Sequence, residues 1–63
     1  MYSFEVEQKV GSKTEKILIN PMHVIFVKAL ANGATAIGLT GGTQINSSTS
    51  YTAVAESLNA AMR

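Results

Sequence analysis

Few residues of this chain could support catalysis. A hydrolytic enzyme needs a nucleophile, a base that activates it and a group that orients the base. The sequence is rich in hydroxyl groups, but His23 is its only imidazole and no acidic residue lies near it in sequence. Glu5, Glu7 and Glu15 fall on the polar side or in the turn of the first predicted hairpin, which is typical of a solvated surface. We therefore predict no catalytic residues and a protein that is not an enzyme.

Metal and cofactor sites are not expected either. One histidine without cysteine cannot supply the ligands of a tetrahedral zinc site, and the chain has no cysteine. Residues 38–42 have the glycines of a phosphate-binding loop, but such a loop leads into a helix and is often followed by a lysine. Here a strand pattern follows, without a lysine, so the segment predicts a hairpin turn. Residues 47–50 precede a helix, where a capping run is favoured over an anion site.

Four lysines are the candidates for nucleic-acid contact. Lys9, Lys13 and Lys16 cluster in the first hairpin with Lys28 near them, and aromatic residues interleave with this stretch. The glutamates of the same stretch cancel most of the positive field, and the formal net charge of the chain is only +1. Nucleic-acid binding is therefore the alternative function and not the favoured one.

Hydrophobic periodicity indicates the elements that must position these residues. It predicts a single α+β domain over residues 1–63, with a small antiparallel β-sheet of four to five strands and one C-terminal helix packed on one face. Residues 2–10 alternate, with Tyr2, Phe4, Val6 and Val10 on the apolar side. A short strand over residues 16–19 stops at Asn20 and a proline. Further strands are predicted over residues 24–30, 35–40 and 44–47.

The turns at residues 32–33 and 41–42 set the register of the last three strands. Asparagine and glycine tolerate the positive φ of tight hairpins, and a slip of one residue moves every side chain to the other face. Two-residue loops would place Lys28 opposite Ile37 and pair Leu39 with Gln44. Three-residue loops are favoured at both turns, because they pair Val27 with Leu39, Ala29 with Ile37 and Leu39 with Ile45. The predicted core face is then Ile25, Val27, Ala29, Ile37, Leu39 and Ile45.

This register also predicts a contact surface. Phe26 and Leu30 project from the opposite face, next to Ala36 and Gly38, which offer almost no side chain. An exposed phenylalanine and leucine over small residues form a candidate contact patch. We therefore predict Phe26, Leu30 and Gly38 as the interface with a partner.

The C-terminal helix is predicted to begin after Ser50, the favoured N-cap residue. Its apolar stripe recurs at helical spacing and covers one side of the sheet. The members of this stripe are Tyr51, Val54, Ala55, Leu58 and Met62.

Size and composition favour self-association. A 63-residue core is close to the lower limit of independent stability, and without disulfides or a metal, association is the remaining stabiliser. The chain is 46% hydrophobic and 14% charged, against about 25% charged in a typical soluble domain. A homodimer or higher homo-oligomer is expected, with a protein partner as a further prospect. No apolar run approaches a membrane span, and a cytoplasmic location is expected.

The pattern between residues 17 and 58 resembles two groups, the FlbD-type small flagellar regulators and the first half of LytTR-type DNA-binding domains. The shared string is Ile17-x-Ile19-Asn20-Pro21, then Val24-Ile25, then Ile37-x-Leu39-Thr40-Gly41-Gly42, then Ile45, a serine and an amphipathic helix. Lys28 and Ala29 replace acidic residues expected after the Ile25 strand, and the second half of a LytTR domain is missing. The resemblance implies a small regulatory or binding protein and transfers no site residue. We predict a non-enzymatic, homo-oligomeric interaction module.

Overall fold

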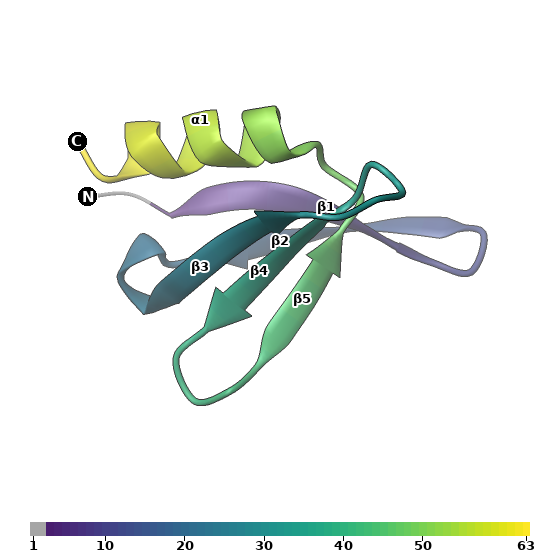
Figure 1. Cartoon of the computed structure of the whole chain (residues 1–63), viewed down its shortest axis with the longest axis horizontal. Helices are drawn as coiled ribbons and strands as arrows, with labels where there is room; N and C mark the ends of the chain where they lie inside the picture. Colours follow the sequence, from purple (N-terminus) through teal and green to yellow (C-terminus); the bar gives the residue numbers. More distant parts are fainter. Residues whose placement is uncertain (1–2) are drawn as a thin grey trace.

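The computed structural model describes residues 3–63. The elements follow in the order β1 (Phe4–Val10), β2 (Lys13–Ile19), the 3-10 helix η1 (Pro21–His23), β3 (Val24–Ala29), β4 (Thr35–Leu39), β5 (Gln44–Ser47) and α1 (Tyr51–Ala61). The α+β prediction is confirmed. The strands divide into two antiparallel sheets, β1-β2 and β3-β4-β5, with α1 packed against β1 and β3 (Figure 1).

The first hairpin has a two-residue turn. Val10 pairs with Lys13, and Gly11 between them adopts a φ of 65°. Because the turn is this short, β2 begins at Lys13, three residues earlier than predicted. Phe4 and Val6 are buried as expected, but Val10 is 51% exposed. The inward prediction for Val10 is wrong because the tip of the hairpin extends past the rest of the molecule (Figure 1). Tyr2 lies outside the described residues.

The two hairpins of the second sheet have three-residue loops, as predicted. The Leu30 N–H donates to the Ala34 carbonyl at 2.9 Å, and the Leu39 N–H donates to the Thr43 carbonyl at 2.8 Å. Each loop begins one residue earlier than expected. The last residue of such a loop takes a positive φ, and in both loops this residue is a glycine. These residues are Gly33, with a φ of 85°, and Gly42, with a φ of 87°.

The earlier loops change the pairing of the strands. Val27 faces Ile37, Ala29 faces Thr35, and Ile37 faces Ile45. The predicted pairs of Val27 with Leu39, Ala29 with Ile37 and Leu39 with Ile45 are therefore wrong. Since the error is two positions, it preserves the face assigned to these side chains.

The core lies between the two sheets and α1. Its buried apolar members are Phe4, Val6, Ile19, Ile37, Val54 and Ala61, and Val27, Leu39 and Ile45 pack against them half-buried. Two predicted core residues are not there. Ile25 is 66% exposed, because a bulge between Val24 and Phe26 places Val24 opposite Leu39. Ala29 is exposed because it ends the edge strand β3.

The helix is confirmed with its predicted cap. The Ser50 hydroxyl accepts a hydrogen bond from the Ala53 N–H at 3.3 Å. Val54 is fully buried and Leu58 packs against the core. Tyr51 and Met62, at the two ends of the predicted stripe, are 46% and 54% exposed. Met62 leaves the stripe because it is the C-cap residue, beyond the last turn of α1.

Hydroxyl groups join the first hairpin to the second sheet. The Glu7 carbonyl accepts from the Ser48 N–H at 2.8 Å and from the Ser47 hydroxyl at 2.5 Å. The Glu7 N–H donates to the Thr49 hydroxyl at 3.0 Å, and the Thr35 hydroxyl donates to the Thr49 carbonyl at 2.7 Å. We call these five residues the hydroxyl clasp. Thr35 and Ser47 are fully buried, whereas Glu7 and Ser48 are exposed, so the clasp extends from the interior to the surface.

Candidate interaction surface

The three-stranded sheet turns one face away from the core. Cross-strand pairing brings together on this face Phe26, Lys28, Ala36, Gly38, Gln44 and Asn46. We call this set the outer face. The central residues Ala36 and Gly38 are buried, whereas the four longer side chains around them are exposed. The outer face is therefore a shallow surface with a small-residue floor.

Phe26 lies directly on Gly38. A Cβ atom at position 38 would overlap Cδ2 and Cε2 of Phe26 and would lie 2.6 Å from its Cζ. The ring packs on the backbone of the neighbouring strand, because glycine leaves the space, and it remains 44% exposed. The structure thus brings Phe26 and Gly38 together as the sequence predicts. Their role in an interface stays a prediction.

Leu30 is not part of this contact. It is half-buried beyond the end of β3, where its N–H bonds to Ala34. The register expected from the sequence placed Leu30 opposite Ala36, but Lys28 occupies that place. Sequence analysis also missed Ile25 as an exposed residue. The signal was the run of four apolar residues at 24–27, which a regularly alternating strand cannot bury on one side.

The four lysines do not form one basic surface. Lys16 pairs with Glu7, so Lys16, Glu7 and Lys9 share the polar face of the first hairpin. Lys13 projects from the opposite face of that hairpin, and Lys28 belongs to the other sheet. All four are exposed, but the field that a nucleic acid would meet is divided among separate surfaces.

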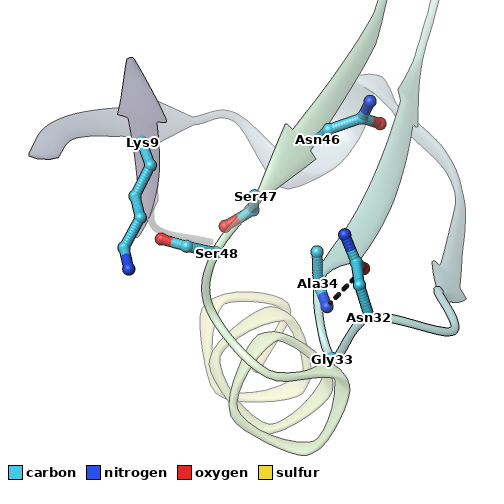
Figure 2. Close-up of a pocket in the computed structure, with 7 residues that line it drawn as sticks. All are labelled: Lys9, Asn32, Gly33, Ala34, Asn46, Ser47 and Ser48. Carbon is cyan, nitrogen blue, oxygen red and sulfur yellow. Dashed lines mark hydrogen bonds between the residues drawn. The ribbon is translucent and has the colours of Figure 1, made fainter. Parts of the chain in front are cut away.

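A polar hollow lies between the ends of β1 and β5 and the loop at residues 31–33 (Figure 2). Its volume is about 370 Å³, and its lining is Lys9, Asn32, Gly33, Ala34, Asn46, Ser47 and Ser48. Lys9 is the only charged member. The Asn32 side chain accepts from the Ala34 N–H at 3.1 Å, and both serine hydroxyls donate to the Glu7 carbonyl. Much of its hydrogen-bonding capacity therefore serves the protein itself.

His23 has a structural contact through its backbone. Its carbonyl accepts from the Thr40 N–H at 2.8 Å and from the Thr40 hydroxyl at 3.2 Å, and these bonds connect η1 to the turn between β4 and β5. The imidazole is exposed. Within residues 3–63, no three histidine or acidic side chains gather as a metal site.

A groove runs between β3 and α1. Its volume is about 360 Å³. The strand side is formed by Val24, Ile25, Phe26 and Val27, and the helix side by Tyr51, Ala55, Leu58 and Asn59. The lining has no charged side chain, which distinguishes it from the hollow at Lys9.

Comparison of the chain with models of known protein families, with curated proteins and with solved structures returns no match. The resemblance to FlbD-type regulators and LytTR-type domains stays a prediction. Among residues 3–63, the structure has no helix of the length and apolar character needed to span a bilayer.

Proposed function

We propose that this protein is a non-enzymatic interaction module that associates with copies of itself through the outer face. The observation that carries the proposal is the position of Phe26. Its ring packs on Gly38, and yet the residue remains 44% exposed. A fixed, partly exposed aromatic ring is the type of side chain that dominates binding energy in protein interfaces.

Composition supports the same function. Beyond Lys28, the only charged residues are Glu56 and Arg63, so the second sheet and the helix have little charge to oppose association. A standard interface takes about 800 Å² from each partner, roughly a fifth of the 4277 Å² that the described chain exposes. The small outer face therefore supports a weak, concentration-dependent association, suited to a regulatory module.

The test is the molar mass in solution. Sedimentation equilibrium from micromolar to millimolar concentration should give a mass that rises above the monomer for the natural protein and stays monomeric for Phe26→Asp. The matched control is Leu18→Asp. Leu18 is 70% exposed on β2 of the other sheet, so the same chemical change there should leave the association intact.

Two results would contradict the proposal. One is a monomeric natural protein over the whole concentration range. The other is an equal mass for Phe26→Asp and the natural protein, with the far-ultraviolet circular dichroism of both unchanged.

A further inference from the structure

β3 is an edge strand. It pairs only with β4 in the described part of the chain. In an antiparallel pair, alternate residues turn their N–H and C=O groups toward the partner strand. Leu30 bonds to Ala34, so the residues of β3 that bond to β4 are those at even-numbered positions. The backbone groups of Val27 and Ala29 therefore point away from β4. This edge offers donors and acceptors to an additional strand.

The groove beside this edge has the length of a short extended peptide. Four strand residues, 24–27, span about 13 Å at ~3.3 Å per residue. The helix stripe from Tyr51 to Asn59 spans about 12 Å at ~1.5 Å per residue. Ala55 lies in the middle of that stripe, where its small side chain leaves room between strand and helix.

The edge strands of the described chain differ in charge. β5 has no charged residue, but its end is joined to β1 through the bond from the Ser48 N–H to the Glu7 carbonyl. The edge strand β2 has three charged residues, Lys13, Glu15 and Lys16, whereas β3 has only Lys28. Charged side chains on an edge strand discourage the addition of another strand. The β2 edge is protected in this way, but the β3 edge is not. The bulge at Ile25 ends the regular ladder at Phe26, so an added strand would bond to Val27 and Ala29.

We propose that the groove between β3 and α1 binds an extended peptide segment of a partner protein as an added strand. The uncharged lining selects apolar side chains at alternate peptide positions. Lys28, which follows the lining residues along β3, selects an acidic residue at one end. A second copy of this chain is the competing occupant, and the variants below distinguish it from a peptide. This site shares Phe26 with the outer face, but its other lining residues lie outside that face, and peptide binding goes beyond the proposed self-association.

The probe is an acetylated peptide of alternating valine and threonine that ends in glutamate, titrated into the isotopically labelled protein and followed by NMR. We expect the largest shifts and new protection from hydrogen exchange at the amides of Val27 and Ala29. Strand addition forms its bonds at these groups. Ala55→Arg fills the groove and should weaken binding on the order of tenfold. The matched control is Ala53→Arg, at an exposed position of α1 outside the groove lining, and it should bind as the natural protein does.

A substitution at Lys28 tests the preference for an acidic peptide end. Lys28→Glu should weaken the glutamate peptide roughly fivefold and favour the same peptide ending in lysine. The proposal is overturned if no peptide binds at millimolar concentration, if the shifts fall on Ala36 and Gln44 instead, or if the two arginine variants bind equally. It is also overturned if Ala55→Arg abolishes self-association, because a second copy then occupies the groove. Peptide binding by a monomeric natural protein would support this site while contradicting the proposed self-association.

Discussion

Gly38→Ala tests whether the space over Gly38 determines the position of Phe26. The φ of Gly38 lies outside the positive region, so alanine can adopt the same backbone. Replacing glycine at such a position normally stabilises a protein by about 0.4–1 kcal/mol, through the unfolded chain. Here the new methyl group would overlap the ring of Phe26, and the ring must leave.

When Phe26 is kept, the stabilisation by alanine through the unfolded chain and the cost of displacing the ring nearly cancel. Full burial of a phenylalanine side chain is worth about 1.5–3 kcal/mol, and slightly more than half of Phe26 is buried. Displacing the ring therefore costs about 1–1.5 kcal/mol. Gly38→Ala alone should lower the free energy of unfolding by about 0.5 kcal/mol, whereas in a Phe26→Ala background it should raise it by a similar amount. The coupling energy between the two positions is then about 1 kcal/mol or more.

Urea unfolding followed by circular dichroism gives the four free energies of this double-mutant cycle. A parallel cycle of Gly38→Ala with Leu18→Ala serves as the control and should be additive, since Leu18 lies on the other sheet. Coupling below about 0.3 kcal/mol between positions 26 and 38 would refute the reasoning, because contacting residues are not additive.

Three further predictions concern the clasp, the cap and the lysines. Thr35→Val removes the buried donor to the Thr49 carbonyl and should lower the free energy of unfolding by about 1–3 kcal/mol in urea unfolding. Thr35→Ser keeps the hydroxyl and should recover part of that loss. Equal losses in the two variants would exclude the hydrogen bond as the cause. Ser50→Ala removes the cap of α1 and should lower the free energy of unfolding by about 1 kcal/mol. Thr52→Ala, at an exposed helix position, should leave it unchanged. Equal effects of the two variants in thermal unfolding would contradict the capping role. Fluorescence anisotropy with single-stranded and duplex DNA should show no strongly salt-dependent binding, because the lysines lie on separate surfaces; a steep salt dependence that Lys9→Ala and Lys16→Ala both reduce would favour the alternative function.

The sequence predicted the elements whose signals are local. The loop lengths, β5, the helix and its Ser50 cap followed from turn residues and periodicity. The exact pairings were not predicted. A three-residue loop can begin at either of two neighbouring residues, and the residue that takes the positive φ decides between them. Glycine at position 33 settles this in the structure. Face assignments survived that error because the shift was an even number of residues.

The surface was harder to predict than the fold. The bulge in β3 exposes Ile25, and the apolar run at residues 24–27 indicates that one of its members is exposed without showing which one. The division of the strands into two sheets depends on contacts between residues far apart in sequence. Within the run at 47–50, Ser50 was correctly predicted as the cap of α1, but Ser47, Ser48 and Thr49 connect to Glu7 instead, which depends on tertiary structure alone.

The hydroxyl clasp has a consequence for the order of folding. The three hairpins close through loops of two or three residues, whereas Glu7 and Ser47 are 40 positions apart in the chain. Closing a loop ten times longer costs about 2 kcal/mol more in chain entropy. We therefore expect the hairpins to form first and the meeting of the first hairpin with the second sheet to be the slow step. We expect clasp substitutions to raise the unfolding rate more than they lower the folding rate, as contacts that form late in folding do.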